Sequence, residues 1–596
     1  MNYSIKDFIE SESIKSVTFS PNGKKIAYLS NRSGSYQIYL IPSKGGQSKQ
    51  LTFLKDQIYF AIFSPTKEEI IFGKSNNGDE KIQLYLFSIK TKKIINLTKN
   101  SKVKHNFGNW SSDGKYITYS KNQRSEKDFD VYILNIKNGK EECIYNSGGN
   151  CYPNSFSPQQ NFITIQKRYS NLKTETLLFS FKNKSIKSII HPKADSYYGG
   201  AYWLPDESAF YFINNTTKNF LGLSLYKISS SEWKYVYTPK FDVEGVRVSH
   251  DGRFLTTIIN KNGYRIINLR KTSDMSEIIL NDLTKLEMVY SVNFSKDSNN
   301  LAMIIGDSVN VSNLYIYSIK NKKIKKLTNS IQKVSSEQLS KPKLSHFKSF
   351  DNLKIPYFIY VPNFKLKKIP VIINIHGGPE AQYRPAFNSF IQYLVYKGYA
   401  IIAPNIRGSS GYGKKYMSLD DIEKRHNAIK DIEYLHKYIK SNKKLDHNNI
   451  ILIGSSYGGY MVLASLVFYS KLWAGGVSLS GISNLETFLK NTAPHRLINR
   501  EIEYGSLKNH KKLLKELSPI NYIKNIKAPL LLIHGKNDPR VSLNEAEQIK
   551  NKLLKLKKQV KLITYKNEGH SLSKLKNKID AYNKIESFLK NTLTNK

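Results

Sequence analysis

Cysteine is scarce in this chain, which has only Cys143 and Cys151 among its 596 residues. Two cysteines cannot supply the framework of several disulfides that small secreted domains use. We therefore expect both thiols to be reduced and structural, as in a cytoplasmic protein. The first residues also lack the apolar stretch of a secretory signal peptide, which favours the same compartment.

Long apolar runs and metal-ligand patterns are missing as well. No run approaches the roughly 18 apolar residues that a membrane-spanning helix needs, so no membrane association is expected. No cluster of His, Cys and Asp shows the spacing of a metal site. The sequence therefore predicts neither a bound metal nor a cofactor.

Acidic residues are few: 47 stand against 92 basic ones, which gives a net charge of +45. A nucleic-acid partner is one interpretation of such an excess. The other is a composition bias, because Lys, Asn, Ile, Tyr and Phe are all abundant, as an AT-rich genome would produce. A binding footprint should gather on one face or stripe, whereas these lysines are scattered along the chain. We favour the bias and expect no specific nucleic-acid partner.

A repeat of about 46 residues organises the first half of the chain. Each unit begins with an aromatic or apolar anchor and a short polar pair, and several continue with an Asn-Gly or Asp-Gly turn and alternating strands, which is typical of hairpins. The seven anchors are Phe19, Phe63, Trp110, Phe156, Trp203, Val248 and Phe294. A period of this length with several strands in each unit is near that of propeller blades, and two packed β-sandwiches would not repeat so regularly. The sequence predicts a seven-bladed β-propeller over residues 1–335.

The rest of the chain, residues 336–596, alternates apolar strands with helices after a polar linker at 330–342. This order predicts an α/β domain with a mostly parallel sheet. Within it, the apolar run 450–453 is followed by Gly454-x-Ser456-x-Gly458 and then by an apolar helix. A strand, this motif and a helix in succession are typical of a nucleophile elbow, which would expose the Ser456 hydroxyl at the top of the sheet.

A nucleophilic serine needs a base, and the base needs an acid that orients it. Asp538 follows the predicted strand 529–533, and His570 follows the next one, 560–565. Each alone could be an ordinary turn or helix-start residue. Together, in the order Ser, Asp, His and each on the loop after a strand, they predict a catalytic triad.

An oxyanion hole is the remaining requirement. His376-Gly377-Gly378-Pro379 follows a predicted strand and precedes the elbow, although Gly and Pro also mark ordinary turns. We expect the backbone N–H groups of Gly378 and Tyr457 to receive the developing oxyanion.

These motifs, together with 405–413 and the run Asn537-Asp538-Pro539-Arg540-Val541, make the chain resemble the prolyl oligopeptidase family. The branch of acylaminoacyl-peptidases and dipeptidyl-aminopeptidases fits best, with a propeller before an α/β-hydrolase domain. Departures are Ser542 where a proline is usual, Asn484 where an acid is usual, and a Trp-Gly pair missing around 424–427. They concern substrate preference more than catalysis.

The resemblance implies several further features. Arg540 would lie in the substrate-binding region, the alternative being an ordinary exposed arginine. Residues 1–13 would pack back on the hydrolase domain, and the propeller would sit over Ser456 and restrict substrate size.

The sequence therefore predicts a serine peptidase that hydrolyses short peptides through an acyl-enzyme. The alternatives are an esterase on the same fold, because one triad serves both reactions, and an inactive propeller-based binding protein. The residue preferred at the scissile bond, the need for a free or acylated amino terminus, and assembly into a homo-oligomer stay open.

Overall fold

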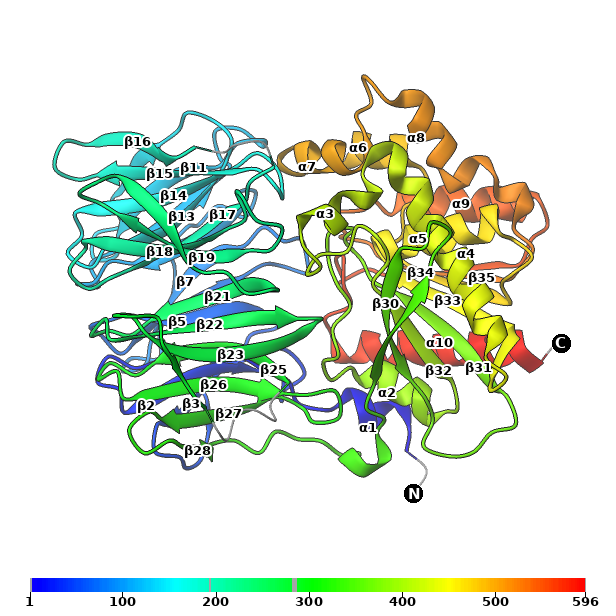
Figure 1. Ribbon diagram of the computed structural model, residues 1–596, viewed down its shortest axis with the longest axis horizontal. Helices are drawn as coiled ribbons and strands as arrows, with labels where there is room; N and C mark the ends of the chain where they lie inside the picture. Colours follow the sequence, from blue (N-terminus) through cyan, green and yellow to red (C-terminus); the bar gives the residue numbers. More distant parts are fainter. Residues whose placement is uncertain (1–2, 192–194, 281–286, 595–596) are drawn as a thin grey trace.

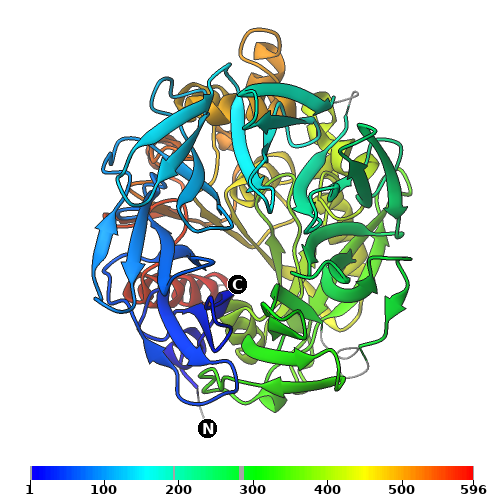
Figure 2. The same ribbon diagram turned by 90° about the vertical axis from the view of Figure 1, so that its left-hand side faces the viewer.

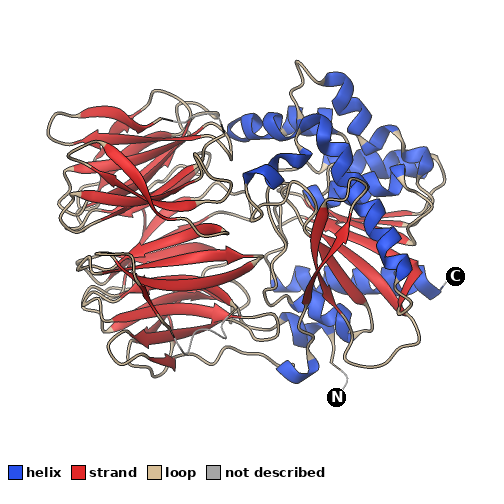
Figure 3. Cartoon of the chain, viewed as in Figure 1, coloured by secondary structure: helices blue, strands red, loops and turns tan. Residues whose placement is uncertain are grey.

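The computed structural model describes residues 3–191, 195–280 and 287–594 (Figure 1). An all-β domain and an α/β domain lie side by side, the first built of strands and the second carrying nearly all the helices (Figure 3). Both predicted architectures are confirmed.

Within the described residues, 28 strands form seven blades of four antiparallel strands, each following the last in sequence. A single bridge between β23 and β25 joins the last two blades into one sheet. The strands of the first four blades are β1 Ile14–Phe19, β2 Lys25–Ser30, β3 Gln37–Pro42, β4 Lys49–Gln50; β5 Ile58–Phe63, β6 Glu69–Lys74, β7 Gln83–Ser88, β8 Ile94–Asn96; β9 His105–Trp110, β10 Tyr116–Lys121, β11 Asp130–Asn135, β12 Glu141–Tyr145; β13 Asn150–Phe156, β14 Phe162–Arg168, β15 Thr174–Ser180 and β16 Ser185–Ile190. Those of the last three are β17 Tyr198–Trp203, β18 Ala209–Asn214, β19 Gly222–Lys227, β20 Glu232–Tyr237; β21 Asp242–Val248, β22 Phe254–Lys261, β23 Tyr264–Lys271, β24 Glu277–Ile278; β25 Met288–Phe294, β26 Asn300–Gly306, β27 Asn313–Ser318 and β28 Lys323–Lys326.

The recurring anchor has a local cause, visible in the turn between β9 and β10. Ser111 Oγ donates to Asp113 Oδ1 at 2.7 Å and accepts from the backbone N–H of Tyr116 at 2.9 Å. The same Ser–Asp bond, also 2.7 Å long, joins Ser249 to Asp251 three blades later. These side chains satisfy the turn's backbone donors, so the motif fixes the first hairpin of each blade that carries it.

The blades form a ring, shown end-on in Figure 2. The ring closes where the first blade meets the last: the backbone N–H of Ile14 donates to Ser312 Oγ, and Ser312 Oγ donates to the Ile14 carbonyl, both at 3.0 Å. Ile14 also shares an apolar cluster with Leu314 of β27. Side-chain packing and these two bonds therefore join the ends of the propeller.

The α/β domain is built on one sheet with strand order β29-β30-β32-β31-β33-β34-β35-β36, parallel from β32 to β36. Its strands are β29 Lys343–Lys348, β30 Lys354–Tyr360, β31 Ile369–Ile375, β32 Ala400–Pro404, β33 Leu445–Ser455, β34 Gly475–Leu479, β35 Leu530–Gly535 and β36 Val560–Tyr565. The helices of the chain are α1 Ile5–Ile9, α2 Ser389–Tyr396, α3 Lys414–Met417, α4 Arg425–Ser441, α5 Tyr457–Phe468, α6 Leu485–Asn491, α7 Pro494–Tyr504, α8 Lys511–Leu517, α9 Asn544–Lys555 and α10 Leu575–Thr594. In the described ranges, no helix has the length and apolarity to span a bilayer.

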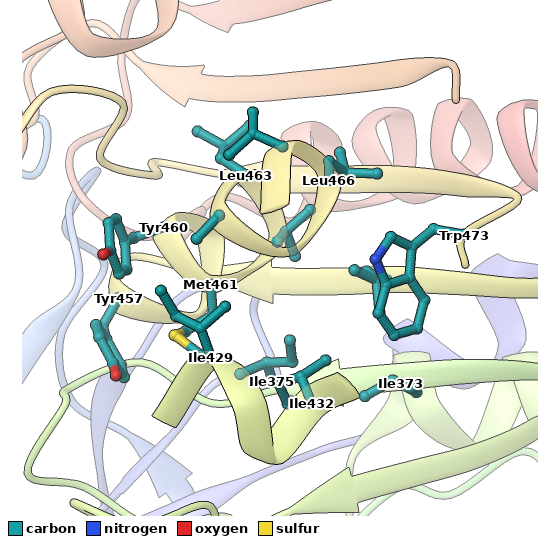
Figure 4. Packing of buried hydrophobic residues seen from close by; sticks show 14 of the residues in the cluster. Ile373, Ile375, Ile429, Ile432, Tyr457, Tyr460, Met461, Leu463, Leu466 and Trp473 are labelled. Carbon is teal, nitrogen blue, oxygen red and sulfur yellow. The ribbon is translucent and has the colours of Figure 1, made fainter. Parts of the chain in front are cut away.

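Apolar cores on both faces hold this sheet. Helices α4, α5 and α9 pack on one face, and α2 and α10 on the other. Figure 4 shows side chains of α4, α5 and β31 packed together in the first of these cores. The labelled side chains of this packing, all in one buried cluster, are Ile373, Ile375, Ile429, Ile432, Tyr457, Tyr460, Met461, Leu463, Leu466 and Trp473. Since α5 begins directly after Ser456, this core fixes the position of that residue.

Helix α1 lies against the α/β domain although it precedes the first blade. Ile5, Phe8 and Ile9 are buried in a cluster with Tyr393 of α2, and the Phe8 and Tyr393 rings meet edge-to-face with centroids 5.4 Å apart. The described part of segment 1–13 thus makes the contact that the resemblance implied, while residues 1 and 2 lie outside the described residues. The domain limits at 335 and 336 stay a prediction.

Candidate active site

Ser456 stands at the turn between β33 and α5 with φ 59° and ψ −121°. A non-glycine residue with positive φ is strained, typically by about 1–3 kcal/mol, and such strain is found chiefly at functional sites. Its backbone N–H donates to the Leu479 carbonyl at the end of β34, at 2.8 Å. Packing and this bond hold the turn in place, with the side chain of Ser456 only partly buried.

Gly454 and Gly458 of the motif lie where the backbone segments approach too closely for a side chain. A Cβ atom on Gly458 would lie 2.1 Å from the Ile375 carbonyl oxygen of β31, and one on Gly454 would lie 2.2 Å from the Gly458 carbonyl oxygen. Either contact is far too short for a real side chain. The motif is therefore required by the approach of β31, β33 and α5, as a nucleophile elbow demands.

Asp538 and His570 meet as the sequence predicted. His570 Nδ1 lies 2.7 Å from Asp538 Oδ2, and the Asp538 side chain is fully buried. The other carboxylate oxygen accepts the backbone N–H groups of Arg540 at 2.8 Å and Val541 at 3.1 Å. Burial alone would raise the pKa of Asp538, but hydrogen bonds from His534 and His570 outweigh it and hold that pKa well below its usual range. The aspartate is thus ionised and fixed in direction.

His534 is a neighbour of this pair that sequence reasoning missed. Its Nε2 lies 2.9 Å from the Val541 carbonyl oxygen and 3.4 Å from Asp538 Oδ2, and its side chain is fully buried. It comes from the end of β35, on the strand that leads to Asp538. A histidine before a glycine is too common in sequences to have indicated this contact.

The end of β34 connects the serine with the histidine. Leu479 accepts the N–H of Ser456, and the hydroxyl of the next residue, Ser480, lies 3.4 Å from the His570 carbonyl oxygen. Strands β33 to β36 run parallel and adjacent, so the loops carrying Ser456, Asp538 and His570 emerge at one edge of the sheet. The structure thus joins Asp538 to His570 directly and places the Ser456 loop at the same edge of the sheet.

The expected oxyanion donors lie beside the elbow. A Cβ atom on Gly377 would lie 3.4 Å from the Ser456 Cβ atom, so the loop 376–379 runs directly past the serine. Tyr457 is the first residue of α5, a position where a backbone N–H has no acceptor within the helix. Both neighbourhoods suit donors for a negative oxygen, and Gly378 follows Gly377 in the same loop.

The side chain of Tyr457 belongs to a buried polar network that the sequence gave no reason to expect. Its hydroxyl donates to Asp420 Oδ2 and accepts from Arg425 Nη1, both at 3.0 Å. Arg425 and Asp420 form an ion pair in which neither side chain is exposed. Arg425 lies in the segment 424–427, where the Trp-Gly pair usual in the family is absent. The Arg425 guanidinium lies 5.0 Å from the Tyr457 ring centroid. The network anchors the residue that follows Ser456.

Asn484, another of the three departures in this domain, is the N-cap of α6 and accepts the backbone N–H of Glu486 at 3.0 Å. A carboxylate still lies beside it, because Glu545 of α9 accepts the N–H of Asn484 at 2.8 Å.

The propeller reaches this site through the loop between β6 and β7. Glu80 Oε1 lies 2.6 Å from Arg540 Nε, and Glu80 Oε2 lies 3.1 Å from Arg496 Nη2 of α7. In the same loop, a Cβ atom on Gly78 would lie 2.5 Å from the nitrogen of Gly569, the residue before His570. Arg540 therefore meets a carboxylate of the propeller, and its predicted part in substrate binding stays a prediction.

An acidic pair, half-buried Glu380 and buried Glu503, lies next to the 376–379 loop. Asn171, beyond the end of β14, donates to Glu380 and, at 3.3 Å, to Glu503 of α7. Burial and the neighbouring Glu503 raise the pKa of Glu380 to about 8. Glu380 is therefore largely protonated at neutral pH, where an ordinary glutamate would carry a charge.

Comparisons with known proteins bear on the family and the fold. Residues 385–596 match the family model described as the prolyl oligopeptidase family, and residues 52–176 match the one described as the dipeptidyl peptidase IV N-terminal region. The chain belongs to the prolyl oligopeptidase family of serine peptidases.

Two relatives match this serine peptidase over nearly its whole length. The chain is 25% identical to the uncharacterized peptidase YuxL of Bacillus subtilis, and the match covers 93% of this chain and 86% of the relative. It is 23% identical to dipeptidyl aminopeptidase BIII of Pseudoxanthomonas mexicana, covering 96% and 86%.

Solved structures share the fold of this serine peptidase. A puromycin-hydrolyzing peptidase of Mycobacterium tuberculosis superposes with a TM-score of 0.87 at 15% identity, covering 99% of this chain and 96% of that one. An acylaminoacyl peptidase of Pyrococcus horikoshii gives 0.75 at 19% identity, covering 99% and 97%. At such identities, these structures support the fold alone.

Among the described residues, no group of three or more His, Cys, Asp or Glu side chains is arranged to hold a metal ion.

Proposed function

We propose that this serine peptidase hydrolyses short peptides with Ser456 as nucleophile, His570 as general base and acid, and Asp538 as the residue that orients His570. The observation that carries the proposal is the 2.7 Å bond between His570 Nδ1 and a buried, ionised Asp538. With Nδ1 donating to the carboxylate, Nε2 is the ring atom left to accept the proton of Ser456.

The reaction would proceed through an acyl-enzyme. Ser456 Oγ attacks the carbonyl carbon of the scissile bond while His570 takes its proton. The negative oxygen of the tetrahedral intermediate is stabilised by the N–H groups of Gly378 and Tyr457, each worth roughly 3 kcal/mol by comparison with deletions of single oxyanion-hole donors. The C–N bond breaks as His570 returns the proton to the leaving amine. Water then releases the acyl group by the same steps.

The contacts between the propeller and the active-site loops support the proposal that only small substrates reach Ser456. The Glu80 loop packs against the loops that carry Asp538 and His570, and two ion pairs join it to Arg540 and Arg496. A substrate must therefore pass through or between the domains. An extended peptide can do so, whereas a folded protein is too wide, and separation of the domains would be a gating step before catalysis.

The test compares one cleavable sequence in two forms, as a short peptide and in an exposed loop of a stable folded protein. Wild-type protein should cleave the peptide and leave the folded protein intact, and Ser456→Ala should cleave neither. Peptide turnover by Ser456→Ala at the wild-type rate would overturn the assignment of the nucleophile. Equal rates on the two substrates by wild-type protein would overturn the size restriction. A matched ester, cleaved while the peptide is not, would assign the site to an esterase.

A further inference from the structure

A polar cavity with four cationic side chains in its lining lies between α7 and the propeller. Its volume is about 190 Å³. Lys104, before β9, and Arg168, at the end of β14, come from the propeller, while Arg496 and Arg500 come from α7. Figure 1 shows α7 extending from the α/β domain towards these blades.

The charges around this cavity are not balanced. Four cationic side chains line it with a single carboxylate, that of Glu503. Glu503 pairs with Arg500 at 2.7 Å, and Arg496 pairs with Glu80 outside the lining. Over the described ranges, neither Lys104 nor Arg168 has a carboxylate within ion-pair distance. Like charges held together away from bulk water are costly unless an anion joins them.

Unpartnered polar atoms accompany this charge. Arg168 Nε is a donor buried without a hydrogen-bond partner among the described residues, although its guanidinium lies 5.5 Å from the Tyr152 ring centroid. Nε2 of His495, which also lines the cavity, has no partner in the described part of the chain either. Burial and the nearby Lys104 and Arg496 lower the pKa of His495 to about 4, so this ring is neutral at neutral pH. Buried polar atoms normally have partners, and the unused donor of Arg168 points to an acceptor that occupies the cavity.

The cavity adjoins the oxyanion loop. Arg500 Nη1 donates to the Gly378 carbonyl at 3.3 Å, and the adjacent Gly377 lies against Ser456. A group bound in the cavity would therefore belong to the substrate near its scissile bond. Planar guanidinium groups match the geometry of a carboxylate, which accepts two parallel N–H donors.

We propose that this cavity binds a carboxylate of the peptide substrate, with Arg168 and Lys104 as the residues that select it. The carboxylate is either the C-terminal one or that of an acidic side chain. The proposal rests on the proposed function, because it names the substrate class of the same site.

A neighbouring cavity of about 350 Å³ carries carboxylates and shares Arg168 and Asn171 with the first. Two of the three acids in its lining, Glu244 and Glu380, are neutralised within the protein. Glu244 pairs with Arg384 and, at 3.3 Å, with Arg265, while the pKa of Glu380 is raised to about 8 by burial and Glu503. Unbalanced charge thus remains on the cationic side.

Binding can be measured without turnover in the Ser456→Ala background. Calorimetric titration would compare four peptides of one sequence: a C-terminal acid, its carboxamide, and amidated versions with Glu or Gln beside the scissile bond. The acid or the Glu peptide should bind about tenfold or more tightly than its neutral partner, as expected for charge-assisted hydrogen bonds. Whichever pair shows the difference identifies the source of the carboxylate.

Variants then locate the effect. Adding Arg168→Gln or Lys104→Gln should reduce the ratio towards one. Lys167→Gln is the matched control, because it removes the same charge from the adjacent residue of β14, whose Nζ bonds to the Tyr145 hydroxyl at 3.0 Å. It should keep the ratio, whereas long-range attraction by a chain of net charge +45 would be weakened equally by all three variants.

Equal affinity for all four peptides would overturn the proposal, as would an equal loss of preference in Lys167→Gln. Hydrolysis by the protein with Ser456 intact is scored separately. Charge-selective binding without hydrolysis would refute the proposed function but support the carboxylate site. Hydrolysis without charge selectivity would support the proposed function but refute the carboxylate site.

Discussion

Asp538 shows how much one side chain depends on its surroundings. One carboxylate oxygen faces His570, and the other accepts two backbone N–H groups from its own loop. These bonds keep the group ionised despite its burial. They also fix which tautomer His570 adopts, and this is the role that the proposed mechanism needs.

Asp538→Asn should therefore lower turnover of a short peptide by a factor on the order of 10⁴. The amide would offer its N–H to His570 Nδ1, so the proton would move to Nε2 and the ring could no longer accept the Ser456 proton. The kcat of the purified variant measures this, and its thermal unfolding midpoint shows whether the fold is kept. Turnover near the wild-type value in a folded variant would mean that another acid orients His570.

Glu380 gives a prediction of pH dependence. Burial and Glu503 raise its pKa in the folded protein to about 8, against an ordinary value of 4.5. The folded state then holds a proton that the unfolded state has lost, so this group destabilises the protein increasingly as pH rises from about 4.5 to 8.

Glu380→Gln keeps an oxygen for Asn171 and removes the titration. Between pH 5 and pH 8.5, the unfolding midpoint of the variant should rise relative to the wild type, by the equivalent of on the order of 2–4 kcal/mol. Glu142→Gln, at an exposed carboxylate of β12, is the control and should follow the wild type. A constant difference between Glu380→Gln and wild type across this range would show that Glu380 is ionised in the folded protein.

Some of these residues could be predicted from the sequence and others could not. Ser456, Asp538 and His570 each follow an apolar strand, and parallel strands place such loops at one edge of the sheet. Glu80 is 460 positions from Arg540. Only the docking of the two domains brings Glu80 and Arg540 together, and no local sequence pattern predicts this docking. Asn171 likewise acquires its partners, Glu380 and Glu503, through tertiary packing.

At the scale of elements, α5 and its surroundings decide where Ser456 stands. The helix begins at Tyr457, whose side chain is tied to Asp420 and Arg425 in a site without exposure to solvent. The elbow was recognisable from its glycines. The Arg425–Asp420 ion pair could not be recognised, because the segment around Arg425 has no pattern beyond its many charged residues.

Arg425→Met should destabilise the protein by about 3–5 kcal/mol, since it leaves the Asp420 carboxylate buried without its partner. The double variant Arg425→Met, Asp420→Asn should recover much of this loss, because the uncompensated charge is gone. Thermal unfolding of the two variants measures both effects. A double variant no more stable than Arg425→Met would show that the network acts through packing of the guanidinium rather than through charge.

The blades show the opposite case, in which local chemistry is enough. Ser111 and Asp113 satisfy their own turn, and a similar turn recurs at Ser249 and Asp251. The repeat in the sequence is thus the repeat of a hairpin. Closure of the ring depends on Ile14 and Ser312, which are 298 positions apart. No repeated motif in the sequence indicates this contact.

At the scale of the whole molecule, the two domains form one site. The α/β domain supplies Ser456, Asp538 and His570, and the propeller supplies Glu80 against Arg540 and two of the cations around the α7 cavity. The proposed peptidase therefore needs both halves of the chain. Under the proposed function, a site enclosed in this way would limit what can reach the serine, and its charges would select among the short peptides that do.

The identity of the nucleophile is the central claim, and covalent labelling tests it most directly. The whole protein would be treated with a fluorophosphonate, digested, and mapped by mass spectrometry, alongside Ser456→Ala and Ser455→Ala. Ser455, the exposed neighbour at the end of β33, is the matched control. The account predicts one adduct, on Ser456, in the wild type and in Ser455→Ala, and none in Ser456→Ala. An adduct on another residue, or full peptide turnover by a protein that takes no label, would contradict it.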